Sequence, residues 1–298
     1  MLALMLNTGS SNPWVIDGGF VTQQCDGFGC HYYRRKFNSK KSSSFLNGNT
    51  TLFLKYASRW SGGPLVKDTV SFGGLTVKQQ EFVDATGIDD SFGGMPFDGI
   101  LGLGWPALSV GITPPMQNLL SSLDSPLFTI WIDNKLDVGM GENTGLTTYG
   151  AIDSTNCHSK VGYAPLTSET YWQFAIDSFS VDTFSEKKQR SALMKHLKYY
   201  GLRFPQNLIN HAISDTGTSW LGLPASVVNV VANLTGAQYD PIMEEYSVDC
   251  STVKTQPDLV FTINGVQYNV PPQEYIISLD SGSNQVMHLF QQKAPNTW

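Results

Sequence analysis

Two short segments of the chain carry residue types that suit acid–base chemistry. Residues 212–220 have the sequence Ala-Ile-Ser-Asp-Thr-Gly-Thr-Ser-Trp, and residues 5–11 have the sequence Met-Leu-Asn-Thr-Gly-Ser-Ser. A single Asp-Thr-Gly is ordinary turn chemistry after a strand. Two copies, each after an apolar strand and before Ser or Thr, indicate a duplicated lobe with the copies meeting at one site. The copies differ at the first position, which is Asp215 in one and Asn7 in the other.

The composition favours a globular β protein with two lobes. The chain has 298 residues, of which 41% are hydrophobic and 15% charged, with 28 Gly and 15 Pro. This length suits two lobes, and few charges with many turn formers favour β structure over helical bundles. The net charge of −6 argues against nucleic acid as a partner. No apolar run is long enough to predict a membrane-spanning helix, and the apolar start lacks the basic region of a signal peptide.

Short strands separated by turns are expected in both halves of the chain. Strands are expected at residues 15–16, 51–56, 97–105, 170–176 and 178–181, and hairpins at 66–77 and 258–270. Gly73-Gly74 and Asn264-Gly265 are the turn signals of the two hairpins. Short helices are expected at residues 113–120, entered through proline, and at 225–232. The predicted lobes are residues 1–153 and 154–298, and a basic segment near 190–211 is interpreted as an insertion before Asp215.

The cysteines, histidines and sequons suggest further chemistry. Cys25 and Cys30 flank a Gly-rich loop that suits a small disulfide, with two free thiols as the alternative. Cys157 and Cys250 either pair or stay free. The five histidines show no metal spacing, so no metal is expected. No cofactor is expected either, because Gly99, Gly102 and Gly104 do not form a dinucleotide fingerprint. Two Asn-x-Thr sequons, at residues 49–51 and 233–235, matter if the chain is secreted.

On these motifs the chain resembles the pepsin-like aspartic proteases (peptidase family A1), most closely the nematode-type members. The matching segments occur in family order: residues 7–12, 14–15, the Cys25/Cys30 loop, Tyr56, 97–104, 149–153 and 213–219. The resemblance implies an all-β, bilobal fold with pseudo-twofold lobes and a central cleft. It also implies hydrolysis of a peptide or protein substrate, bound in extended conformation, at acid pH. A monomer in an extracellular or lysosomal location is expected on the same ground.

The family's chemistry requires two carboxylates that share one proton. By position in the motifs, Asp215 matches one catalytic Asp and Asn7 the other. The remaining matches are Thr8 and Thr216, which cross-bond the loops, Ser10 and Thr218, whose hydroxyls support the carboxylates, and Tyr56, Gly9 and Gly217 in the flap and substrate-binding loops.

Asn7 decides the functional expectation. Its amide carries no charge and takes up no proton near neutral pH, so the pair is reduced to one carboxylate. Loss of a general acid–base partner costs roughly 10²–10⁴ in rate. The chain is therefore expected to be an inactive or strongly impaired endopeptidase. The alternatives are a homologue that binds peptides or a partner without cutting, or the product of an imperfect gene model.

Other departures from the family pattern lie at the flap and at the ends of the chain. Residues 57–59 are Ala-Ser-Arg where the family has Gly-Thr-Gly after the flap tyrosine, and glycine there permits positive φ. Both ends look short against the family, and an Ile-Leu-Gly-Asp strand behind the second motif is missing. The resemblance thus predicts a fold truncated at both ends.

Overall fold

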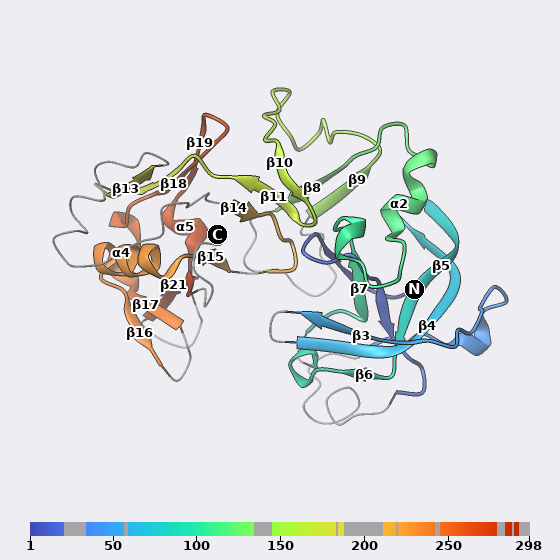
Figure 1. The fold of residues 1–298 in the computed structure, drawn as a ribbon. Coiled ribbons are helices and arrows are strands. Elements are labelled where there is room, and N and C mark those ends of the chain that lie inside the picture. Colours follow the sequence, from blue (N-terminus) through green and yellow to red (C-terminus); the bar gives the residue numbers. More distant parts are fainter. Residues whose placement is uncertain are drawn as a thin grey trace. The chain divides into compact units, whose positions relative to one another are not determined.

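The chain folds into two compact units rich in β-strands (Figure 1). The structure is a computed structural model, which describes residues 1–20, 34–56, 59–93, 95–133, 145–182, 184–187, 211–218, 220–241, 245–278, 284–287 and 289–291. The units are Met1–Val161 and Gly162–Trp298. The predominance of strands confirms the predicted all-β class. Within the described ranges, no helix is long and apolar enough to cross a membrane.

The first unit is organised on one large sheet. In its described part, the strand order of this sheet is β1-β7-β2-β5-β4-β3, with β6 paired to β4, and β8 and β9 form a separate pair. The strands are β1 (Leu4–Asn7), β2 (Trp14–Ile16), β3 (Thr51–Tyr56), β4 (Arg59–Phe72), β5 (Leu75–Ala85), β6 (Gly87–Ile88), β7 (Gly99–Gly102), β8 (Phe128–Ile132) and β9 (Gly145–Tyr149). The helices are α2 (Pro115–Leu119) and short 3-10 turns at Ser39–Lys41, Asp90–Phe92, Pro106–Leu108 and Leu120–Ser122.

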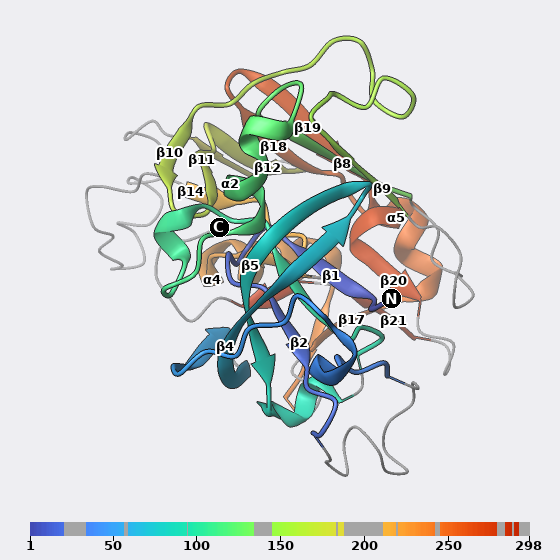
Figure 2. The same cartoon turned by 90° about the vertical axis from the view of Figure 1, so that its right-hand side faces the viewer.

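The β4–β5 hairpin is the longest element of this sheet (Figure 2). Its turn lies at Gly73 and Gly74, both with positive φ, which confirms the turn predicted from the sequence. β4 begins at Arg59, earlier than the predicted hairpin at 66–77. The sequence did not predict this extension because it contains Gly63 and Pro64, residues that usually weaken a strand. A Cβ on Gly63 would lie 2.1 Å from the Asp84 carbonyl oxygen. The missing side chain therefore lets the neighbouring backbone approach.

Close backbone contact also fixes β1, the strand that ends in Asn7. β1 runs parallel to β7, with Asn7 opposite Gly102. A Cβ on Gly102 would lie 2.4 Å from the Ser11 carbonyl carbon. The alternation of Gly with Ile and Leu in β7 thus serves the close approach expected from the sequence.

Gly102→Ala should lower the free energy of unfolding by about 2–3 kcal/mol, because the new methyl group meets backbone atoms that have little room to move. The matched control is Gly74→Ala, where no atom lies within 4 Å of the new Cβ and only the positive φ is unfavourable. That control should cost about 1 kcal/mol. Urea denaturation of both variants measures the difference, and equal losses would contradict the packing account.

The core of the first unit surrounds Trp14, whose side chain is fully buried. Its ring lies 5.5 Å from Phe92 and 6.4 Å from Phe97, measured between ring centroids. Tilted and edge-on aromatic pairs of this kind are favourable beyond the area that they bury. Trp14 follows the Asn7 loop and Phe97 precedes β7. This cluster therefore packs the segment after the Asn7 loop against the segment before β7.

The second unit contains several small sheets and one longer helix. Its strands are β10 (Leu166–Glu169), β11 (Trp172–Ala175), β12 (Ser178–Val181), β13 (Phe184–Lys187), β14 (His211–Ile213), β15 (Leu221–Leu223), β16 (Gln238–Asp240), β17 (Glu245–Asp249), β18 (Leu259–Ile263), β19 (Val266–Val270), β20 (Ile276–Ser278), β21 (Asn284–Met287) and β22 (Leu289–Gln291). Its helices are α4 (Ala225–Thr235), α5 (Pro272–Tyr275) and a 3-10 helix at Cys250–Thr255. In the described residues the sheets have the orders β10-β11-β14, β13-β12-β18-β19, β15-β22 and β16-β17-β21-β20.

Helix α4 supplies one side of this unit's core, although it is rich in β-branched valines that are weak helix formers. Val227, Val228 and Val231 are fully buried and lie on one face of the helix. The helix ends at Gly236, which has a φ of 70° and stops it in the left-handed conformation. Burial of the valine face therefore outweighs the low helix propensity.

The structure describes the turn predicted at 264–265 and the end of the segment near 190–211. The Asn264-Gly265 turn between β18 and β19 is confirmed, with positive φ at both residues. The segment interpreted as an insertion near 190–211 leads into β14, where His211 pairs with Ala175 of β11. Residues 190–210 lie outside the described residues.

Candidate functional site

The Asn7 loop is a tight turn at the end of β1. Asn7 is only 5% exposed, and its side-chain Oδ1 accepts a hydrogen bond of 2.8 Å from the Gly9 backbone N–H. The Asn7 carbonyl accepts a second bond of 2.8 Å from the backbone N–H of Leu103, just beyond β7. The bond from Gly9 fixes the orientation of the Asn7 side-chain amide, because its oxygen must face the Gly9 N–H donor. The Nδ2 group is therefore the part of the amide that remains for other partners.

Residues that follow Asn7 anchor this loop to the segment after β7. The buried Ser11 hydroxyl donates to the Trp105 carbonyl at 2.6 Å. The buried Asn12 amide bonds the backbone of Val110 in both directions, accepting from its N–H at 3.0 Å. The Ser10 hydroxyl is buried and has no hydrogen-bond partner in the described part of the chain. The anchors hold the loop while leaving one hydroxyl oxygen beside it unused.

The Asp215 loop repeats this local construction in the second unit. It follows β14, which pairs with β11, and the Ser214 N–H donates to the Trp172 carbonyl at 3.0 Å. Asp215 Oδ1 accepts from the Gly217 backbone N–H at 2.8 Å, the same type of contact and the same length as in the Asn7 loop. The Asp215 carbonyl lies 3.4 Å from the N–H of Thr218, an exposed residue.

The two loops thus offer different chemistry on matching backbones. One carboxylate oxygen of Asp215 is bound to Gly217, which leaves the other oxygen able to accept a proton or a hydrogen bond. The Asn7 amide offers only N–H donors at the corresponding atom. The threonines beside them, Thr8 and Thr216, are buried and partly exposed respectively. Each loop therefore has the same side-chain-to-backbone hydrogen bond, within its own unit.

Tyr56 ends β3, at the tip of the hairpin that β3 forms with β4. Its ring meets Phe92 edge-on, with 5.9 Å between the ring centroids. Burial raises the pKa of the Tyr56 phenol above its ordinary value. The phenol is thus neutral and packed on the Trp14 cluster. Residues 57–58 of the tip lie outside the described residues.

Arg59, the first residue of β4, lies on the same hairpin. The Arg59 guanidinium lies 5.4 Å from the centre of the Phe92 ring, within the range of a cation–π interaction. The pKa of the nearby Asp89 carboxyl is lowered, first by hydrogen bonds from Ser91 and to a smaller degree by the Arg59 charge. Arg59 therefore links the hairpin to the 3-10 turn that carries Phe92.

The cysteines and the possible metal ligands are only partly covered by the described residues. Cys25 and Cys30 lie outside the described residues, so their proposed disulfide stays a prediction. Cys157 is partly exposed and forms no disulfide with the residues that the structure describes. Among the described residues, no cluster of three or more His, Cys, Asp or Glu side chains has the arrangement of a metal site.

Several supporting residues could not be identified from the sequence. Ser11 and Asn12 stand next to the motif but carry no signal for their bonds to residues more than ninety positions away. Phe92 lies in an Asp-Ser-Phe turn with no periodic pattern around it. Only the repetition of the Asn/Asp-Thr-Gly motif pointed to the two loops, because that signal is local to the chain.

Comparisons with known proteins give a consistent result. The family model described as eukaryotic aspartyl protease matches residues 1–298. Aspartic protease 1 of Caenorhabditis elegans is 46% identical over 286 residues, covering 95% of this chain and 67% of that protein. Aspartic protease 17 of the same organism is 46% identical over 286 residues, covering 94% and 68% respectively. Human gastricsin is 32% identical over 279 residues, covering 92% and 65%. The chain thus spans about two thirds of the length of these relatives.

Proposed function

Because this chain belongs to the eukaryotic aspartyl protease family, we propose that it is a peptide-binding member whose hydrolytic step is strongly impaired by Asn7. The substrate class is a peptide or protein segment in extended conformation, bound by a monomer. The names of the matched relatives, aspartic proteases and gastricsin, support the peptide substrate class. An extracellular or lysosomal location is part of the same proposal.

One observation carries this proposal: Asn7 Oδ1 accepts the Gly9 N–H at the same 2.8 Å as Asp215 Oδ1 accepts the Gly217 N–H. The amide therefore fits the loop that would hold a carboxylate, and the substitution leaves the backbone of the loop in place. The difference between Asn and Asp at this position lies at the second terminal atom of the side chain, Nδ2 in Asn7 and a carboxyl oxygen in Asp. A carboxyl oxygen there would accept or donate a proton, whereas Nδ2 of Asn7 only donates hydrogen bonds.

The consequence for chemistry follows from the two roles that peptide hydrolysis requires. A base must take a proton from the attacking water, and an acid must donate towards the oxygen of the scissile carbonyl. Asp215 supplies one carboxyl group. Asn7 supplies a neutral donor that aids binding of a polar group but transfers no proton, so binding survives while turnover is lost.

Binding by the unaltered chain tests this proposal. In isothermal titration at acid pH with a peptidic aspartic-protease inhibitor that carries a hydroxyl at the scissile position, we expect saturable binding to one site. Asp215→Ala should weaken binding roughly 10- to 100-fold, since hydrogen bonds to a charged group contribute about 1.5–3 kcal/mol. Absence of saturable binding, or equal affinity in the variant, would contradict the proposal.

A further inference from the structure

An acceptor sequon lies on the surface of the first unit. Asn49, Thr50 and Thr51 immediately precede or begin β3, and all three residues are exposed. β3 is the edge strand of its sheet in the described part of the chain. The Asn-x-Thr pattern marks sites where a glycan is attached to the Asn amide nitrogen. Both side chains that define the pattern are therefore accessible in the folded protein.

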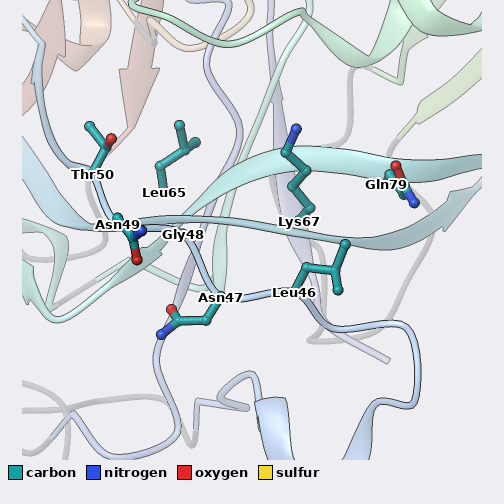
Figure 3. Close-up of a pocket in the computed structure, with 8 residues that line it drawn as sticks. All are labelled: Leu46, Asn47, Gly48, Asn49, Thr50, Leu65, Lys67 and Gln79. Atoms are coloured by element: carbon teal, nitrogen blue, oxygen red, sulfur yellow. The ribbon is translucent and has the colours of Figure 1, made fainter.

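The segment before β3 runs close to β4, and a pocket lies beside it (Figure 3). Leu46 and Lys67 exchange backbone hydrogen bonds of 2.8 and 3.0 Å, and Leu65 donates to Thr50 at 2.7 Å. Between these two contacts Gly48 approaches β4 closely, since a Cβ on it would lie 2.0 Å from the Leu65 carbonyl oxygen. The pocket beside this segment has a volume of about 410 Å³, and Asn49 is one of the residues that line it.

The lining of this pocket suits the first sugar of a glycan. Polar groups come from Asn47, Gln79 and Lys67, whose amine also pairs with Glu81 at 3.0 Å. Apolar surface comes from Leu65 and from Leu46, which is 49% exposed. A sugar ring carries hydroxyl groups at its rim, which suit polar side chains, and C–H groups on its faces, which suit apolar side chains. The pocket thus offers both polar and apolar groups beside the sequon.

The second sequon, at residues 233–235, is built differently. It forms the last turn of α4, where residues two positions apart point to different sides of the helix. Thr235 is only 7% exposed, and its hydroxyl donates to the Val231 carbonyl at 2.8 Å. The folded protein therefore presents one sequon, at Asn49, in which both the Asn and the Thr side chains face solvent.

We propose that Asn49 is the acceptor of an N-linked glycan, an inference that rests on the secretory location included in the proposed function. The co-reactant is an oligosaccharide linked to a lipid pyrophosphate in the lumen of the secretory pathway. The Asn49 amide nitrogen forms a bond to C1 of the first sugar, and the bond from C1 to the pyrophosphate oxygen breaks. The lipid pyrophosphate leaves, the amide nitrogen releases one proton, and no group is oxidised or reduced.

The test uses the full chain with a cleavable secretory leader, produced in cultured eukaryotic cells. Every version carries Asn233→Gln, so that only the Asn49 sequon is available. Three chains are compared: this parent, Thr51→Val, which destroys the sequon, and the matched control Thr50→Val, which keeps it. The readouts are gel mobility before and after treatment with a peptide:N-glycosidase, and the mass of the peptide containing Asn49, where that enzyme converts glycosylated Asn to Asp.

We expect the parent and Thr50→Val to carry one glycan that the glycosidase removes, and Thr51→Val to carry none. A parent that reaches the medium unmodified would overturn the assignment, as would a glycan that persists in Thr51→Val. The leader delivers the chain to the lumen whatever its own location is. An unmodified parent therefore contradicts the glycan assignment alone, while inhibitor binding tests the proposed function separately.

Discussion

Asn7→Asp should raise the rate of peptide hydrolysis by roughly 10²–10⁴ over that of the unaltered chain, the usual contribution of one positioned acid–base group. The Gly9 N–H that Asn7 Oδ1 accepts at 2.8 Å would serve a carboxylate oxygen equally well, so the loop needs no rearrangement. The new carboxyl adds the second titrating group that the family's chemistry requires. The ratio of kcat/KM on an unfolded protein substrate at acid pH measures the effect.

The double variant Asn7→Asp, Asp215→Asn is the matched control for this gain. It also contains one carboxylate and one amide, but with the two exchanged between the loops. Its rate should return to the low level of the unaltered chain, because a single carboxylate cannot fill both proton-transfer roles. If Asn7→Asp stays as slow as the double variant, impairment lies elsewhere, with residues 57–59 of the hairpin tip as the next place to test.

Asp84→Asn should remove a decline in the stability of the first unit as pH rises. Asp84 lies in β5 opposite Val15 of β2, is 4% exposed, and has a buried Oδ1 without a partner in the described residues. Its pKa is raised to about 7, first by burial and then by the charge of Asp17 and a hydrogen bond with that side chain. The folded protein therefore holds this carboxyl in its protonated form up to near-neutral pH.

The direction of the pH effect follows from the two protonation states. In the unfolded chain an aspartate titrates near 3.9, so between about pH 4 and pH 7 only the folded state keeps the proton. The free energy of unfolding then falls as pH rises through this window, by roughly 4 kcal/mol in total, and is constant above it. Full stability from this carboxyl is present at acid pH.

Hydrogen exchange of amides in β2 and β5, followed from acid to neutral pH, measures this effect locally. The unaltered chain should lose protection across the window, and Asp84→Asn should keep it. Asp89→Asn is the control, because the pKa of that carboxyl is lowered and its contribution is lost only at lower pH. A decline that persists unchanged in Asp84→Asn would contradict the assignment to this carboxyl.

Much of the fold was predictable from the sequence because the relevant signals are local. The turn residues at 73–74 and 264–265 predicted both hairpins, since Gly and Asn adopt positive φ more readily than other residues. Strand β3 was predicted with its observed bounds from a run of β-forming residues. The Gly-Ile-Leu-Gly alternation predicted the close contact of β7 with its neighbours.

The rest was not predictable because it depends on pairs far apart in the chain. Val15 and Asp84 meet only through the parallel register of β2 and β5, so no local pattern revealed the buried Asp84 carboxyl beside Asp17. The contact of Arg59 with Phe92 likewise joins a hairpin to a separate turn. At the candidate site, residue types were predictable from the repeated motif, whereas the anchors of the Asn7 loop were not.

We propose that this chain binds peptides without appreciable hydrolysis because Asn7 transfers no proton. Incubating the purified, unaltered chain with a denatured protein at acid pH, with and without a peptidic aspartic-protease inhibitor, tests this proposal. We expect no cleavage of peptide bonds beyond the level of a control without the chain in either sample. Steady turnover that the inhibitor abolishes would contradict it.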